Sequence, residues 1–282
     1  MTYLLLLLAT IFNGICPVIS KQYNNRATSQ NPYLYTAVSN LFIAVFFFVS
    51  AGFRLEFNPG FLPYSIGFGV ACMVCSIGMV LATKTGSLSL TSLIMAYSLI
   101  LPTFHGIIFL GDDIGVLTVI GLIILLISLF LINIKKGDNK FKPIWILFVA
   151  MAFFGNGFCS IIQKMEQVAF DGGYKSEYMI FAALFTMIAS LVIWLFQSKN
   201  KKIELKEAAP WGAIAGLNTG ALNLAVMILT GLLPNAILFP SVSAGGIVLA
   251  FIIATFVYKE KLTKTQLVGY AAGLVSVILL NL

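Results

Sequence analysis

The chain has few charged residues and few side chains suited to acid–base or nucleophilic chemistry. Only 10% of its 282 residues are charged, and it contains one histidine. A soluble domain of average composition is about a quarter charged, so this chain is too apolar to be stable in water. It has no glycine-rich nucleotide loop, no GxSxG motif and no sequence cluster of His, Cys and Asp. These absences leave ATP hydrolysis and catalysis without a basis, and no cofactor is expected.

Cysteine is also scarce, and its spacing indicates neither disulfides nor a metal site. All four cysteines lie inside apolar stretches: Cys16, Cys72, Cys75 and Cys159. The Cys72-x-x-Cys75 spacing is typical of metal ligands, but no histidine or second cysteine pair lies nearby in sequence to complete four ligands. In apolar surroundings a cysteine packs as a small apolar residue, so packing is the expected role.

Long apolar runs are what the chain has in abundance. Hydrophobic residues make up 60% of it, and its mean hydropathy is +0.99. A helix needs about 20 apolar residues to cross a hydrocarbon core of roughly 30 Å. Ten stretches have this character, at about 2–20, 33–53, 60–82, 88–110, 114–134, 143–163, 177–197, 209–229, 233–257 and 264–281. Such runs favour helices over barrel strands, so we expect an all-α integral membrane protein with ten transmembrane helices.

The basic residues are divided unevenly between alternate loops. With ten spans, one side of the membrane collects fourteen of the seventeen Lys and Arg residues, and the other side has Arg54, Lys164 and Lys175. By the positive-inside rule the basic loops are cytoplasmic, which predicts a multi-pass protein of the cell membrane with both termini outside. The formal charge of +7 therefore indicates orientation in the lipid bilayer and not a nucleic-acid partner.

Two motifs occur once in each half of the chain. At an offset of 143, Asn13, Gly14, Cys16, Ile19 and Lys21 match Asn156, Gly157, Cys159, Ile162 and Lys164. At an offset of 148, Gly121, Leu126, Ser128, Leu131 and Asn133 match Gly269, Leu274, Ser276, Leu279 and Asn281. We therefore expect the stretch at 2–20 to be one copy of a repeated helix and not a cleaved signal peptide. We expect a first repeat at 1–134, a basic linker at 135–142 and a second repeat at 143–282.

Each repeat contains five spans, and an odd number makes the second repeat enter the membrane in the opposite sense. Inverted repeats are typical of secondary transporters, with the substrate site near the midplane between the halves. The sequence therefore predicts two inverted five-helix repeats that move a small metabolite or drug-like solute by alternating access. A monomer is expected and a homodimer is left open. A non-transporting scaffold or subunit and a lipid-handling protein are the alternatives.

Several segments resemble a known superfamily. In the second half these are Ser243-Ala244-Gly245-Gly246-Ile247-Val248, then Glu260-Lys261-Leu262, then Gly269; in the first half the segment is "ATKTGSLSLTSLIMAYSLILP", which ends at Pro102. In the order of these motifs and in its repeat, the chain resembles ten-helix, EamA-like members of the drug/metabolite transporter superfamily, and its halves are similar to small multidrug resistance proteins. The resemblance implies a five-plus-five helix transporter.

One departure from the small multidrug resistance proteins concerns the coupling ion. Those proteins carry a membrane-embedded glutamate eight residues before a lysine, and it couples drug efflux to proton entry. Here the residues eight before Lys21 and Lys164 are Asn13 and Asn156. An amide cannot exchange a proton, so proton-coupled drug export by that route is not expected. A facilitator, or coupling through His105, is favoured instead.

Asn13 and Asn156 are the first candidates for substrate binding, because buried amides need hydrogen-bond partners. Either they bind a polar solute, or they join helices, as polar residues commonly do in membranes. The further candidates for substrate binding are Tyr97, Asn218, Asn223, Phe239 and His105. Those for gating or interfacial placement are Lys21, Lys84, Lys164 and Glu260. Gly212, Gly216 and Gly220 form a small-x-x-x-small ladder, which predicts close helix packing.

Overall fold

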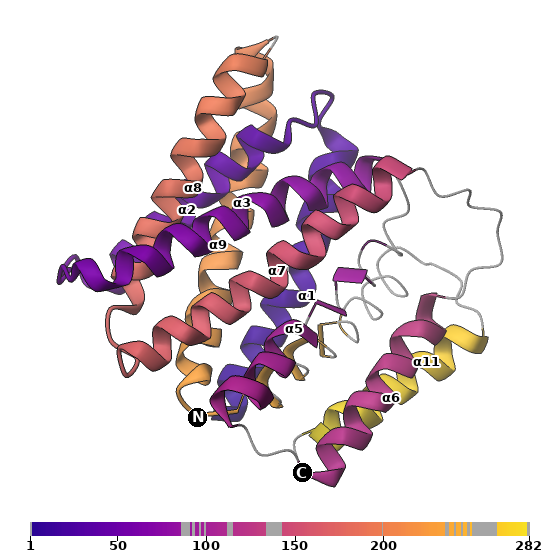
Figure 1. Ribbon diagram of the computed structural model, residues 1–282. Helices are drawn as coiled ribbons and strands as arrows, with labels where there is room; N and C mark the ends of the chain where they lie inside the picture. Colours follow the sequence, from indigo (N-terminus) through magenta and orange to yellow (C-terminus); the bar gives the residue numbers. More distant parts are fainter. Residues whose placement is uncertain are drawn as a thin grey trace.

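The computed structural model of the chain is helical throughout the part that it describes (Figure 1). It describes residues 2–85, 100–111, 115–133, 143–198, 200–234 and 264–280, with single positions between 91 and 98 and between 237 and 249. The helices are α1 (Thr2–Arg26), α2 (Pro32–Ser50), η1 (Pro59–Phe61), α3 (Leu62–Thr85), α5 (Ile100–His105), η2 (Gly106–Leu110), α6 (Val116–Asn133), α7 (Pro143–Ala169), α8 (Lys175–Gln197), α9 (Lys201–Thr230) and α11 (Lys264–Leu280). The expected all-α class is confirmed.

Six helical segments are long and apolar enough to cross a bilayer, which makes the chain a multi-pass membrane protein. They are Thr2–Arg26, Pro32–Ser50, Pro59–Ala82, Pro143–Ala169, Lys175–Gln197 and Lys201–Thr230. Shorter apolar helices at Leu101–Leu110 and Val119–Ser128 fall within two further predicted spans. Most of the predicted span at 233–257 lies outside the described residues.

Three helices extend beyond the spans that hydropathy predicted. α1 continues to Arg26 and α7 to Ala169, while α9 begins at Lys201 and not near 209. The side chain of Asn200 accepts a hydrogen bond from the backbone N–H of Ile203 and caps the start of α9. The added turn is rich in Lys, Glu and Leu, which are good helix formers, so the helix continues although its residues are no longer apolar. Hydropathy predicts which residues lie in the hydrocarbon layer, whereas capping residues determine where the helix begins and ends.

Close helix crossings use glycine, as the ladder in α9 predicted. Cβ atoms added at Gly212 and Gly220 would lie 2.8 Å from Val38 Cβ and 2.9 Å from Phe46 of α2. Gly216 of α9 lies against the carbonyl oxygen of Ser39, which also belongs to α2. On the other side, the Thr186 hydroxyl of α8 donates to the Gly69 carbonyl of α3 at 2.9 Å. Small residues therefore bring α2, α3, α8 and α9 into one packed group (Figure 1).

α6 and α11 pack side by side as an antiparallel pair (Figure 1). The Ser128 hydroxyl donates to the Gly269 carbonyl at 2.6 Å, and the Ser276 hydroxyl donates to the Gly121 carbonyl at 2.8 Å. These four residues form two of the five pairs that match at an offset of 148. As the numbering falls from 128 to 121 in α6, the partner rises from 269 to 276 in α11, so the two helices run in opposite directions.

Two glutamates tie the α1–α2 loop to α9. Glu204 Oε2 accepts hydrogen bonds from Trp194 Nε1 at 2.6 Å and from Asn31 Nδ2 at 2.9 Å. Glu207 accepts from the Thr28 hydroxyl at 2.6 Å and from the Ser29 hydroxyl at 2.8 Å. We call this set of contacts the carboxylate clasp. It joins a loop near residue 30 to the start of α9 and closes one end of the helix group.

Candidate functional site

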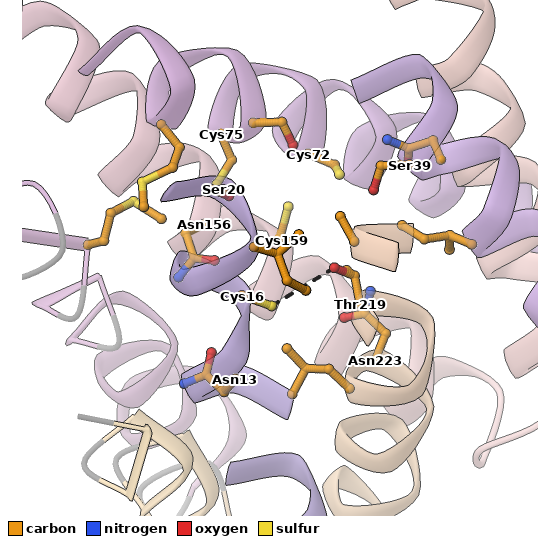
Figure 2. A pocket seen from close by; sticks show the side chains of 18 of the residues that line it. Asn13, Cys16, Ser20, Ser39, Cys72, Cys75, Asn156, Cys159, Thr219 and Asn223 are labelled. Atoms are coloured by element: carbon orange, nitrogen blue, oxygen red, sulfur yellow. Dashed lines mark hydrogen bonds between the residues drawn. The ribbon is translucent and has the colours of Figure 1, made fainter. Parts of the chain in front are cut away.

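A cavity of about 350 Å³ lies among α1, α2, α3, α7 and α9 (Figure 2). Residues from both ends of the sequence line it: Asn13, Gly14, Cys16, Ile19, Ser20, Tyr35, Ser39, Asn40, Ile43, Phe68, Cys72, Cys75, Ser76, Met79, Val80, Met95, Asn156, Cys159, Ala215, Thr219, Leu222, Asn223, Ser243 and Gly246. In Figure 2, Asn13 and Asn156 lie on one side of the view, and Thr219 and Asn223 lie on the other. The cavity is thus enclosed by helices far apart in sequence.

The wall of this cavity is polar but carries no formal charge. Among the described residues that line it there are four amides, several hydroxyls, four thiols and two thioethers, and no Asp, Glu, Lys, Arg or His. Amides and hydroxyls both donate and accept hydrogen bonds. A charged solute without a counter-charge would lose much of its hydration free energy in such a site, whereas an uncharged polar solute would keep its hydrogen bonds.

The two repeated asparagines occupy comparable positions in the wall. Asn13 Nδ2 donates to the Val242 carbonyl at 3.3 Å, and Asn156 Nδ2 donates to the Ser98 hydroxyl at 2.7 Å. An amide nitrogen has two N–H groups, so each of these bonds uses one of the two donors. The amides are therefore oriented by a neighbouring segment while retaining hydrogen-bonding capacity toward the cavity.

The glycine that follows each asparagine permits a close helix crossing beside the cavity. Gly157 lies against the Leu101 side chain of α5. A Cβ at Gly14 would lie 2.9 Å from Leu249 Cδ2 and 3.0 Å from the Gly246 carbonyl oxygen. A larger residue at either position would push the neighbouring segment away. The Asn-Gly pair in each repeat thus places an amide and a tight crossing at the same level.

All four cysteines contribute to the cavity wall, a role that sequence reasoning missed. They are free thiols. Asn218 Nδ2 donates to Cys16 Sγ at 3.1 Å, and Cys159 Sγ donates to the Phe68 carbonyl at 3.9 Å. Within the described part of the chain, no group of three or more His, Cys, Asp or Glu side chains is arranged to hold a metal ion. The signal in the sequence was the pairing of Cys16 with Cys159 in the repeat, beside the two asparagines.

The other predicted substrate-binding residues are distributed between the cavity and its surroundings. Asn223 lines the cavity, while Asn218 supports it from behind through bonds to Cys16 Sγ and the Phe12 carbonyl. Tyr97 donates its hydroxyl to the Leu126 carbonyl of α6 at 3.3 Å. Phe239 is buried in an apolar cluster with Ala9 and Leu238, and the His105 ring, at the end of α5, lies at a tilt beside the Phe109 ring with centroids 5.2 Å apart. These last three residues are not among those that line the cavity.

The residues predicted for gating have different environments. Lys164 is buried, and its Nζ donates to the Thr230 carbonyl at the end of α9 at 2.6 Å. Lys84 is exposed at the end of α3. The Lys21 side chain and Glu260 lie outside the part of the chain that the structure describes. Of these residues, only Lys164 has a described contact that joins two helices.

Comparisons with known proteins identify a family match and a similar fold. Residues 1–134 match the model of the EamA-like transporter family. No curated protein matches the chain significantly. A protein of known crystal structure superimposes on it with a TM-score of 0.74, over 99% of this chain and 95% of its own, at 12% sequence identity. At that identity the likeness concerns the fold alone.

Members of the EamA-like family are membrane transporters of small solutes and not enzymes. The match therefore fits a chain whose described helices surround a polar, uncharged cavity. The family resemblance seen in the sequence is confirmed over residues 1–134, which match the EamA-like transporter family, part of the drug/metabolite transporter superfamily.

Proposed function

We propose that the chain is a secondary transporter that carries a small, uncharged polar solute through the central cavity by alternating access between two inverted five-helix halves. The observation that carries this proposal is the composition of the cavity. Its wall combines residues of both halves, and two of its side-chain pairs, Asn13 with Asn156 and Cys16 with Cys159, are separated by the same 143 residues. A site shared in this way lies where two repeats meet.

Equivalent helix contacts in the two halves support this arrangement. Gly69 of α3 approaches the Ala182 carbonyl of α8, and Gly216 of α9 approaches the Ser39 carbonyl of α2. Positions 39 and 182 differ by 143, the offset of the first repeated motif. The antiparallel α6–α11 pair, in which each serine donates to the other helix, supports an inverted relation between the last helices of the halves.

Further equivalent contacts occur at the cavity wall. Gly157 meets Leu101, and Gly14 meets Leu249. Residues 14 and 157 differ by 143, and 101 and 249 differ by 148, so the two contacts correspond under the offsets of the two motifs. The EamA-like match ends at residue 134, where the first repeat was predicted to end. We therefore propose halves at 1–134 and 143–282 joined by the linker 135–142.

The size and chemistry of the cavity define the proposed solute. Its volume of about 350 Å³ is near the lower end of the range for small-molecule sites, roughly 300–1,000 Å³. Four amides and several hydroxyls offer donors and acceptors, while Phe68 and the two methionines offer apolar surface. A compact metabolite with amide, hydroxyl or heterocyclic groups and no net charge fits this wall best. Asn13, Asn156 and Asn223 are the proposed hydrogen-bonding residues.

The four native thiols provide a test that works before the solute has been identified. Purified chain in lipid nanodiscs is incubated with individual uncharged polar metabolites, and alkylation of the cysteines by a maleimide is followed by mass spectrometry. A solute in the cavity slows alkylation and raises the melting temperature, because it binds only the folded state. Flux of each such solute is then measured in proteoliposomes.

The variant Asn13→Leu, Asn156→Leu removes both amides from the wall. We expect the flux of the identified solute to fall by at least about tenfold, the effect of losing roughly 1.4 kcal/mol of binding. Asn25→Leu changes an exposed asparagine of α1 and serves as the matched control with wild-type flux. Wild-type flux in the double variant would remove the amides from the site. Thiol protection without flux would favour a non-transporting receptor or subunit.

The orientation in the cell membrane belongs to the same proposal. Fourteen basic residues on one side predict cytoplasmic basic loops and external termini. A cysteine introduced at Gly137, in the linker, is expected to react with a membrane-impermeant thiol reagent only after the cytoplasmic side is exposed. Reaction from outside in intact cells would reverse the assignment.

A further inference from the structure

Glu166 is a completely buried carboxylate in the last turns of α7. Its side chain is 0% exposed. One carboxylate oxygen, Oε2, accepts a hydrogen bond from Gln167 Nε2. The other, Oε1, is buried without a hydrogen-bond partner among the described residues. An ionised carboxylate is rarely buried without donors for both oxygens, because each unsatisfied oxygen loses its hydration free energy without compensation.

The surroundings of Glu166 do not supply the donors that an ionised carboxylate needs. Two further buried oxygens there, Gln167 Oε1 and Tyr178 Oη, also have no hydrogen-bond partner in the described structure. The Tyr178 hydroxyl carries a proton of its own, but it does not donate that proton to Glu166. This corner between α7 and α8 thus contains three buried oxygens without a partner. One proton on Glu166 would add a donor and would remove the negative charge.

The two charged groups near Glu166 have opposite effects on its negative charge. Lys175 attracts the carboxylate and Glu177 repels it, and both belong to α8. The Lys175 ammonium donates to the Gly172 carbonyl in the α7–α8 turn. On α7 itself, Lys164 donates to the Thr230 carbonyl of α9.

The other helices packed on α7 add no charged group near Glu166 within the part of the chain that the structure describes. α3 contributes the tyrosine Tyr64 and the thiols Cys72 and Cys75, and its one charged residue, Lys84, lies at its opposite end. α5, which touches Gly157, carries His105. The part of α9 near Thr230 has no titratable side chain.

A second buried glutamate, Glu204, has two donors on its Oε2, and its Oε1 is not among the described buried atoms that lack a partner. Glu204 of the carboxylate clasp accepts from Trp194 Nε1 and Asn31 Nδ2, which are donors on two separate elements. The position equivalent to Glu166 in the first repeat, 143 residues earlier, is Tyr23, whose hydroxyl donates to the Asn31 carbonyl at 2.9 Å. The unpaired carboxylate is thus particular to the second half.

α7 connects Glu166 to the cavity. Cys159 lines the cavity seven residues earlier, and Gln163 Nε2 donates to the carbonyl of Asn223, another lining residue, at 3.5 Å. Lys164 then joins α7 to α9 through Thr230. A movement of this end of α7 would therefore break two α7–α9 hydrogen bonds and change access to the cavity. An ionised Glu166 favours such movement, because exposure restores its hydration.

We propose that Glu166 is a proton-binding site of this chain, protonated while its end of α7 is packed into the helix group and ionised when that end of α7 opens. The proton leaves the carboxyl group for water on opening and returns on closure, so no other reactant is needed. The site itself is independent of the proposed transport; its use in coupling a proton to solute movement rests on the proposed function.

The proton is tested by infrared difference spectroscopy on the full chain in nanodiscs, titrated from about pH 5 to about pH 9. We expect the C=O stretching band of a protonated carboxyl group to titrate in the wild type and to be absent in Glu166→Gln. Glu204→Gln, which alters the other buried glutamate, keeps the band. Glu166→Asp keeps a carboxyl group and shifts the band, which covers the case of a Gln variant that does not fold. A band that persists in Glu166→Gln, or is lost in Glu204→Gln, overturns the proposal.

The link to opening is tested through Cys159 in the same preparations. Its rate of maleimide alkylation is measured by mass spectrometry in wild type and in Glu166→Gln. The ratio of the two rates at one pH cancels the intrinsic pH dependence of thiol reactivity. An opening that releases one proton becomes about tenfold more favourable for each unit of rising pH. The alkylation rate of the wild type divided by that of Glu166→Gln therefore rises by up to about tenfold per pH unit. A ratio that stays flat overturns the link between the proton and opening.

These outcomes are distinct from those of the transport assay. If no metabolite protects the thiols or is transported, while the carboxyl band and the pH-dependent ratio are found, the proposed function fails and the proton site stands. If a solute is transported and the band is missing, transport stands and the proton site fails.

Discussion

The carboxylate clasp gives the most direct prediction of stability. In Glu204→Ala, Trp194 Nε1 and Asn31 Nδ2 lose their shared acceptor, and the indole N–H remains in a site where Trp194 is 7% exposed. The loop that precedes α2 is then held by the more exposed contacts of Glu207. We expect lower stability and looser packing of the start of α9 on the rest of the molecule.

The magnitude follows from the two hydrogen bonds. A bond to a charged acceptor contributes about 1.5–3 kcal/mol, which gives an upper value of about 6 kcal/mol for two such bonds. Removing a buried carboxylate also removes its desolvation penalty, which offsets several kcal/mol. The expected net loss for Glu204→Ala is about 3 kcal/mol. Glu204→Gln retains an acceptor oxygen of the same shape, and the expected loss is about 1 kcal/mol, the value of an ordinary hydrogen bond.

The assay is reversible unfolding of the detergent-solubilised chain by increasing SDS, followed by far-ultraviolet circular dichroism. Trp194→Phe, alone and combined with Glu204→Ala, completes a double-mutant cycle. The interaction free energy from the cycle is expected to be about 1–2 kcal/mol, because the indole N–H and the carboxylate are a contacting pair. Glu207→Ala is the matched control, in which a neighbouring and more exposed carboxylate of the same helix is removed with a smaller effect.

An unfolding free energy of Glu204→Ala within about 0.5 kcal/mol of the wild type, the range typical of surface substitutions, would refute this reasoning. A larger loss of stability in Glu207→Ala than in Glu204→Ala would refute it equally. A cycle with no interaction free energy would show that the short Trp194–Glu204 contact does not stabilise the fold.

Three other expectations follow from the structure. Gly216→Val should strongly destabilise the fold, because a side chain there meets the Ser39 carbonyl; Gly231→Ala, at an exposed helix end, is its near-neutral control in the same unfolding assay. Ser128→Ala and Ser276→Ala should each lower the free energy of unfolding by about 1 kcal/mol, since their hydrogen bonds are equivalent. Clearly unequal losses would contradict that equivalence. The four native thiols should all be protected by one cavity solute, and protection confined to one would contradict a shared cavity.

Long apolar runs determined the class of this protein without the structure. Their lengths and composition predicted transmembrane helices, because a backbone in hydrocarbon must satisfy its own hydrogen bonds. The sequence also paired Asn13 with Asn156 and Ser128 with Ser276, and the glycine ladder of α9 was confirmed as a close crossing. Such features are local or periodic, so they can be read along the chain.

Helix ends were predicted less well than helix cores. Hydropathy placed the start of the eighth span at 209, whereas α9 begins at Lys201, capped by Asn200. Its first two turns include Glu204 and Glu207, which bind a loop more than 170 residues away in sequence. Hydropathy alone treats these residues as a polar loop, because it contains no term for the partner that buries them.

Tertiary structure alone decided what each polar side chain does. The sequence predicted a packing role for the four cysteines, yet all of them line one cavity, because α1 and α7 each direct one cysteine and α3 directs two toward the same space. Lys164 read as an interfacial lysine, and its partner at Thr230 is 66 residues away. Glu166 was not singled out at all, since one glutamate near the end of a span has no pattern. Its burial without a donor exists only once α7, α8 and α9 are packed together, and the physical consequence of that burial is the proton site proposed above.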